Sequence, residues 1–176
     1  GLSHTCGLTG TGAAWCWGYN VVGQLGDNSD TDRYAPVEVS LPSGVTGFTS
    51  LTAGSFHTCG LSNTGTVYCC GYNEFGQLGN DNNSTPYSFT PVAVSPPNGV
   101  SGFVSIMAGD DHTRALTSTG AAYCWGKNVS GQLGNNSQTD TFTPVAVSLP
   151  LGVTGFANLT AGMNHTGALT STGGAY

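Results

Sequence analysis

The chain has 176 residues and a formal charge of −6, and only 7% of its residues are charged. Three scattered cations, Arg33, Arg114 and Lys127, exclude the clustered basic surface that nucleic-acid binding needs, because phosphate neutralisation supplies most of that affinity. No apolar run approaches the ~20 residues of a spanning helix, so we expect no membrane insertion, and the 28 glycines are typical of short strands joined by tight turns.

An internal repeat organises the whole chain. Histidines recur at nearly constant spacing, at His4, His57, His112 and His165. Two longer blocks return in the same order: Gly-Gln-Leu-Gly begins at Gly23, Gly76 and Gly131, and Pro-Val-x-Val begins at Pro36, Pro91 and Pro144. Agreement of several blocks at one period indicates a repeat architecture. We expect one domain over residues 1–176, with repeats at approximately 1–43, 44–98, 99–151 and 152–176, the first and last incomplete.

Each repeat is predicted to form four strands, since no sustained helical period is present. In the second repeat these strands are Val45–Ala53 with a turn at Gly47, Phe56–Leu61, Val67–Tyr72 and, after a long polar loop, Pro91–Val94. The terminal proline suits the start or the edge of a strand. Four strands in a unit of this length favour a propeller blade over the shorter coil of a solenoid. The predicted fold class is all-β, with blades of four antiparallel strands and about three and a third repeats of a larger ring.

The hairpin between the second and third strands has a register that the sequence itself suggests. With the turn centred at Thr11 in the first repeat, His4 faces Gly18 and Gly7 faces Trp15. Equivalent registers in the later repeats again place a histidine opposite a glycine and a small residue opposite an aromatic one. Close packing across a ladder requires such complementary sizes.

The same register brings cysteines face to face, Cys6 with Cys16 and Cys59 with Cys69. Directly facing positions need only slight closure to be bridged, so we predict these two disulfides, with four buried free thiols as the alternative. A pairing that occurs twice favours an oxidising compartment and therefore a secreted or cell-surface protein.

Two further cysteines are expected to be free or engaged elsewhere. In the third repeat Arg114 takes the first cysteine position, so Cys124 lacks its cross-strand partner. Cys70 stands where the first and third repeats have tryptophan.

A resemblance to a known family rests on five ordered blocks: Ala-Gly, His-Thr-Cys, Trp-Gly-Tyr/Lys-Asn, Gly-Gln-Leu-Gly and Pro-Val-x-Val. Together they resemble the repeat of the regulator of chromosome condensation family, over essentially the whole chain. The resemblance implies a propeller that usually closes with seven blades. It implies no single function, because the founding member is a nuclear exchange factor for the GTPase Ran that also binds chromatin, while bacterial relatives include secreted propellers, among them a β-lactamase inhibitor. We expect this chain to be similar to the bacterial secreted type.

Candidate sites are weak in this sequence. The repeated histidines suit either a ring of metal ligands or a repeated packing role, and their constant glycine partner favours packing. The loop Asp27–Asp32 alternates oxygen-bearing residues but lacks the glycine and distal glutamate of a calcium loop, which favours a solvated turn. The Gly-Gln-Leu-Gly block lacks the Lys-Ser/Thr of a phosphate loop, and its leucine is expected between blades. With no catalytic constellation, we predict no enzyme, no metal and no cofactor.

Three functions compete. The first is a non-enzymatic extracellular scaffold whose repeats mediate protein contact or self-assembly, as a homo-oligomer or fibre. The second is a binding module that captures or inhibits a partner protein through long-loop aromatics, and the candidate contact residues are Tyr34, Phe75, Tyr87 and Phe142. Guanine-nucleotide exchange is a remote third, because the acidic chain argues against a chromatin partner.

Overall fold

A computed structural model of the protein describes residues 1–160 and 162–176, and it is built from strands alone. The strands in chain order are β1 (His4–Leu8), β2 (Ala14–Gly18), β3 (Arg33–Glu38), β4 (Phe48–Ala53), β5 (His57–Ser62), β6 (Val67–Tyr72), β7 (Tyr87–Ala93), β8 (Ser105–Ala108), β9 (His112–Leu116), β10 (Ala122–Gly126), β11 (Thr141–Ala146), β12 (Asn158–Ala161) and β13 (Thr166–Leu169). The predicted all-β class is confirmed, and no helix of membrane-spanning length and apolarity occurs among the described residues.

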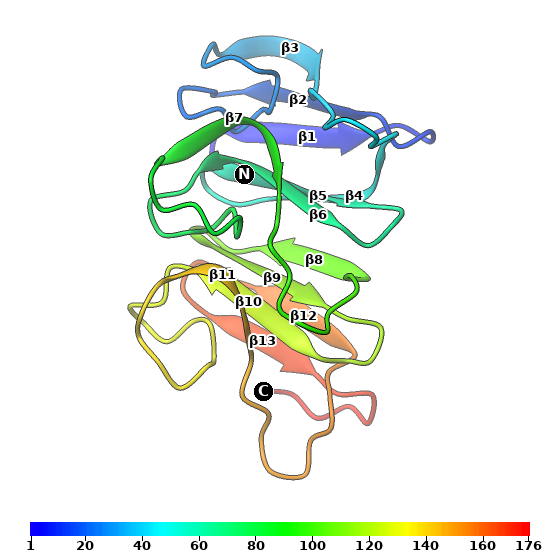
Figure 1. The fold of residues 1–176 in the computed structure, drawn as a ribbon, viewed down its shortest axis with the longest axis vertical. Helices are drawn as coiled ribbons and strands as arrows, with labels where there is room; N and C mark the ends of the chain where they lie inside the picture. The colour runs from blue at the N-terminus through cyan, green and yellow to red at the C-terminus, as the bar shows by residue number, and fades with distance from the viewer.

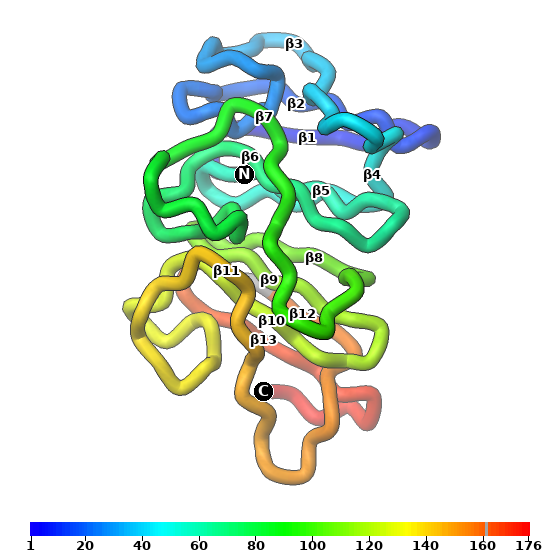
Figure 2. Tube along the Cα trace, viewed as in Figure 1, coloured from blue at the N-terminus to red at the C-terminus, as the bar shows by residue number. Residues whose placement is uncertain are grey.

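The strands form four consecutive blades that stack face to face (Figure 1). The second and third blades are complete four-stranded sheets, ordered β4-β5-β6-β7 and β8-β9-β10-β11 from the inside outward. The first blade holds β1-β2-β3 and the fourth holds β12-β13. The inner strands β4, β8 and β12 contact one another in succession, so they face a common axis. Figure 2 shows the chain leaving each outer strand and crossing to the inner strand of the next blade.

The predicted hairpin register is confirmed in every repeat. His4 pairs with Gly18 and Cys6 with Cys16 in the first blade, and the same pairing recurs in the second and third blades. In the fourth, Ala168 and Tyr176 exchange both backbone hydrogen bonds, at 2.8 and 2.9 Å. The periodicity therefore predicts the pairing residue by residue.

Two strand starts differ from the prediction by three or more residues, while both ends of β5 and the end of β7 differ by one. β4 begins at Phe48 rather than at Val45, because the Val45 amide closes a turn by donating to the Pro42 carbonyl at 3.0 Å. β7 begins at Tyr87, so Pro91 lies inside the strand rather than at its start. Its missing N–H is tolerated there because β7 pairs only with β6 and leaves its other edge open.

The hydrophobic core lies between blades. Three clusters fill the successive interfaces, and the leucine of each Gly-Gln-Leu-Gly block is almost completely buried, as predicted, at Leu25, Leu78 and Leu133. The structure contains both predicted disulfides, Cys6–Cys16 and Cys59–Cys69. Cys70 and Cys124 are free and buried.

Candidate functional site at the rim of the inner turns

The two ends of the blades are built differently (Figure 1). The first and third strands of a blade run in the same direction, so the turn after the first and the long loop after the third emerge at one end. We call this end the inner-turn rim: residues 1–3, 54–56, 109–111 and 162–164, with 19–22, 72–75 and 127–130 after the third strands. The other end, the hairpin rim, carries the hairpin tips at 9–13, 62–66, 117–121 and 170–174.

A buried histidine supports each inner turn. The His57 ring packs directly against Gly54, where a β-carbon would collide with it. Its Nε2 lies 2.9 Å from Thr113 Oγ1 of the next blade. The Thr113 hydroxyl has one hydrogen, and it donates that hydrogen to the Gln77 carbonyl at 2.8 Å. His57 Nε2 must therefore be the protonated nitrogen, and it donates to Thr113.

The same relay links the first two blades, where His4 Nε2 lies 2.8 Å from Thr58 Oγ1, which donates to the Gln24 carbonyl at 2.7 Å. Burial lowers the pKa of His57 to about 3 and that of His4 to about 4, so both rings are neutral at pH 7. The histidines thus join neighbouring blades. Each lies in its own interface, and among the described residues no three His, Cys, Asp or Glu side chains gather as a metal site would require.

The repeats differ on the inner-turn rim, as they also do in the long loops between the Gly-Gln-Leu-Gly and Pro-Val-x-Val blocks. Between the constant glycine and the constant histidine, successive repeats read Leu-Ser, Ser-Phe, Asp-Asp and Met-Asn, starting at Leu2, Ser55, Asp110 and Met163. After the third strand they read Tyr-Asn-Val-Val, Tyr-Asn-Glu-Phe and Lys-Asn-Val-Ser, starting at Tyr19, Tyr72 and Lys127. Only the asparagine is constant in the second set.

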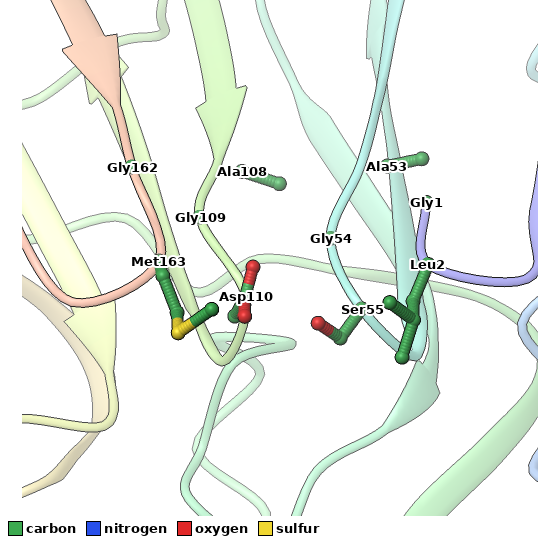
Figure 3. Close-up of a pocket in the computed structure, with 10 residues that line it drawn as sticks. All are labelled: Gly1, Leu2, Ala53, Gly54, Ser55, Ala108, Gly109, Asp110, Gly162 and Met163. Atoms are coloured by element: carbon green, nitrogen blue, oxygen red, sulfur yellow. The ribbon is translucent and has the colours of Figure 1, made fainter.

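The first of these two sets, the variable residues between the constant glycine and histidine, surrounds a depression of about 380 Å³ at the axis. Its walls come from the inner turns of all four blades, and the side chains of Leu2, Ser55, Asp110 and Met163 emerge beside one another at this end of the strands (Figure 3). Leu2 is 70% exposed and Met163 is 64% exposed. The rim therefore combines apolar side chains with a carboxylate around one hollow.

Aromatic and charged contacts order the outer part of this rim. Lys127 Nζ lies 3.1 Å from an Asp111 carboxylate oxygen and 4.7 Å from the centre of the Phe75 ring. The Tyr19 ring packs edge-on against Phe56 of the next blade, with 6.1 Å between centroids. The Lys127–Phe75 and Tyr19–Phe56 contacts cross blade boundaries, so they join the loops of neighbouring blades on this rim.

The four predicted contact residues do not form one patch. Phe75 lies on the inner-turn rim and is partly buried beneath Lys127. Tyr34 and Tyr87 are exposed near the starts of outer strands, Tyr34 at 99%. Phe142 is partly buried at the start of β11, and its carbonyl accepts the Asp81 amide of the preceding blade at 3.0 Å. A contact role for these four remains a prediction.

The long loops are held from within by the constant asparagine. In the first blade the Asn20 amide donates to Asp27, Ser29 and Thr31 oxygens at 3.0–3.2 Å, while its carbonyl oxygen accepts the Leu25 amide at 3.0 Å. Burial alone would raise the pKa of Asp27, but hydrogen bonds from Ser29, Arg33 and Asn20 hold it below its ordinary value. The carboxylate that resembled a calcium ligand thus pairs with internal donors, including Arg33 Nη2 at 2.7 Å.

Sequence reasoning missed the inner-turn positions and the asparagine. The signal is present when the repeats are aligned. Two consecutive positions differ between otherwise similar copies, and an Asn follows each third strand without exception. Neither resembles a catalytic or metal motif, so a search for such motifs passes over both.

Stacked four-stranded blades with their inner strands around one axis define a β-propeller repeat protein. The sequence profile of the regulator of chromosome condensation (RCC1) repeat matches residues 11–61, 64–116 and 119–169, and the chain belongs to this family.

Relatives and solved structures agree with this assignment. The chain is 34% identical over 154 residues to the ultraviolet-B receptor UVR8 of Arabidopsis thaliana, covering 85% of this chain and 33% of that protein. It is 34% identical over 179 residues to the regulator of chromosome condensation of Homo sapiens, covering 99% and 40%. Prp20p of Saccharomyces cerevisiae, described with its binding to Gsp1p and histones, superposes with a TM-score of 0.82 at 24% identity, covering 94% and 41%. The chain thus spans less than half the length of these relatives.

Proposed function

We propose that this chain is a non-enzymatic propeller module that binds a protein partner through its inner-turn rim. The carrying observation is that the two residues between the constant glycine and the constant histidine differ in every repeat and that the first of each pair lines one hollow, where Leu2 and Met163 are exposed. Positions that only maintain the fold have the same structural role in every blade, so they keep similar residues in every repeat. Positions that contact a partner meet a different part of it in every blade and diverge.

The chemistry of the rim suits a protein surface better than a small molecule. Its exposed apolar side chains, Leu2, Val21, Val129 and Met163, are spread over all but the second blade, and Leu2 and Met163 line the hollow. Apolar anchors surrounded by polar groups are typical of protein interfaces. Prp20p, a structural neighbour of the same fold, is described as binding Gsp1p and histones, which supports a protein partner of some kind here.

The two disulfides support a secreted or cell-surface location for this module, because such bonds persist in oxidising compartments. The bacterial secreted type of propeller fits this location.

The test compares rim and non-rim variants of equal chemistry. Leu2→Asp and Met163→Asp change exposed apolar residues on the rim, and Leu151→Asp changes a fully exposed leucine between blades, away from it. The wild-type chain is used to isolate a partner from the extracellular fraction of its source, and affinity is then measured for all three variants. We expect both rim variants to weaken binding at least tenfold with unchanged melting temperature, while Leu151→Asp binds normally. Equal binding by all variants would contradict the proposed surface.

A second candidate, the self-assembling scaffold, is favoured by the near-identity of the hairpin tips at the other rim. It predicts a native mass that rises with concentration above 17.8 kDa and falls after substitution on the hairpin rim. Sedimentation measurements therefore separate the two functions.

A further inference from the structure

The three blade interfaces are not equivalent. In the first two, the histidine of one blade donates to the threonine of the next. In the third, Thr166 still donates to the Gln132 carbonyl at 2.6 Å, but His112 makes no hydrogen bond to any described residue. The relay is broken only where the third blade also differs in sequence.

That difference is Arg114, which occupies the position of the disulfide cysteines Cys6 and Cys59 and lies directly opposite Cys124. Arg114 is completely buried, and none of its three guanidinium nitrogens has a hydrogen-bond partner among the described residues. An unpaired buried cation is strongly unfavourable. Native proteins supply such a group with a counter-ion or with hydrogen-bond acceptors.

Nearby side chains do not supply that charge. Burial lowers the pKa of Arg114 to about 10, and the neighbouring group that opposes this shift is the Cys124 thiol rather than a carboxylate. Burial raises the pKa of Cys124 to about 12, so its thiol is neutral at pH 7. Arg114 therefore keeps its positive charge inside an interface whose core is otherwise apolar, formed by Leu116, Phe156 and Leu159 among others.

His112 adds a second donor on the same side of the sheet. His112 and Arg114 are two apart on β9, so their side chains leave the same face about 6.6 Å apart. This face is turned toward the fourth blade, as the equivalent His57 and Cys59 are turned toward Thr113 in the third. A ring with the same protonated Nε2 as His57 would present an N–H beside the guanidinium. The two groups are both buried, both without partners and both donors.

We propose that the interface between the third and fourth blades binds a small inorganic monoanion of the chloride type, held by the Arg114 guanidinium and the His112 imidazole. The anion replaces the disulfide as the feature that completes this interface. This inference does not depend on the proposed partner surface.

Thermal unfolding in matched salts tests the site. The protein is melted in sodium chloride and in sodium gluconate at equal ionic strength, because gluconate is too large to enter. A ligand that binds only the folded state raises the melting temperature, and we expect chloride to raise that of the wild type by at least ~3 °C. Arg114→Met should abolish the difference. Arg33→Met removes the solvent-accessible arginine paired with Asp27 and should retain it.

The outcome that overturns the proposal is a chloride effect of the same size in Arg114→Met, or none in the wild type. A second measurement uses the wild type alone, in case Arg114→Met does not fold. Crystals soaked in sodium bromide should show an anomalous peak within hydrogen-bonding distance of the Arg114 guanidinium. A site that refines as water without anomalous signal would equally overturn it.

Discussion

The hairpin rim of this propeller is nearly constant among repeats, whereas the inner-turn rim is not. On the hairpin rim, the carbonyls of Gly12, Gly65 and Gly120 each accept the amide of a phenylalanine in the next blade at 2.8 Å. The first three hairpin tips are therefore part of blade interfaces. On the inner-turn rim the constant glycine and histidine make the interface, and the two residues between them are left to vary. The comparison teaches that repeats can share one fold and still differ at positions whose side chains are not needed for the blade interfaces.

Acid should have the largest effect, because it acts on the histidines beneath the inner turns. Burial holds the pKa of His4 near 4 and those of His57 and His112 near 3, below the ~6.5 of an unfolded chain. The unfolded state binds more protons, so stability is complete above pH 6.5 and falls as the pH drops toward 4. We expect a loss of about 4 kcal/mol per pH unit from the three together, measured by urea unfolding at several pH values.

A matched variant separates the histidines from other acid effects. His57→Gln keeps a polar side chain without the titrating ring, and it should reduce this slope by about a third. An unchanged slope would show that the buried rings are not responsible.

The next largest effect on stability should come from a substitution within the sheet of the third blade. Arg114→Cys restores the facing pair of the first two blades, since Arg114 and Cys124 share the register of Cys59 and Cys69. We expect a third disulfide and a gain of about 3 kcal/mol in the free energy of unfolding under oxidising conditions. Mass spectrometry after thiol blocking counts the bridges. If the gain persists after reduction, removal of the buried charge explains it instead.

Substitution on the hairpin rim should lower the free energy of unfolding by a smaller amount. Gly65 has a φ of +83°, and a β-carbon there would lie 3.1 Å from the Phe103 carbonyl oxygen. We expect Gly65→Ala to cost about 2 kcal/mol in chemical denaturation. The control is Gly10→Ala, at a hairpin tip with open space around it. If both variants lost the same free energy of unfolding, the close contact between Gly65 and the next blade would not explain the cost of Gly65→Ala.

The smallest effect on stability should come from the inner-turn rim. Asp110 lies beside the axial hollow, and its contribution to the interface is a backbone carbonyl that accepts the Ser55 amide at 3.0 Å. We expect Asp110→Ala to change the free energy of unfolding by less than about 0.5 kcal/mol, while affinity for the partner falls by about 1 kcal/mol. Calorimetric titration and thermal unfolding of the same samples check both halves. A large loss of stability would mean that this rim, too, serves the fold.

Much of the fold followed from periodicity. The cross-strand pairs were predictable because the side-chain period of a strand is two, so one hairpin centre determines every facing pair. The start of β7 was not, because Tyr87–Thr90 follow a polar loop and the proline at Pro91 gave a false boundary. The inner-turn residues of the candidate site were not predicted from the sequence, for a related reason. Exposed aromatics such as Tyr34 stand out in a sequence, whereas the inner turns become a single surface only when separate blades meet around an axis.

The outermost strands β3, β7 and β11 each carry a proline, at Pro36, Pro91 and Pro144. In these three blades the outer edge therefore lacks one backbone N–H donor, which discourages a foreign strand from extending the sheet there. Aggregation from the sides of the molecule is correspondingly suppressed, even though its surface carries few charges to keep copies apart. Under the proposed function, a partner would therefore contact side chains at the ends of the sheets rather than exposed backbone.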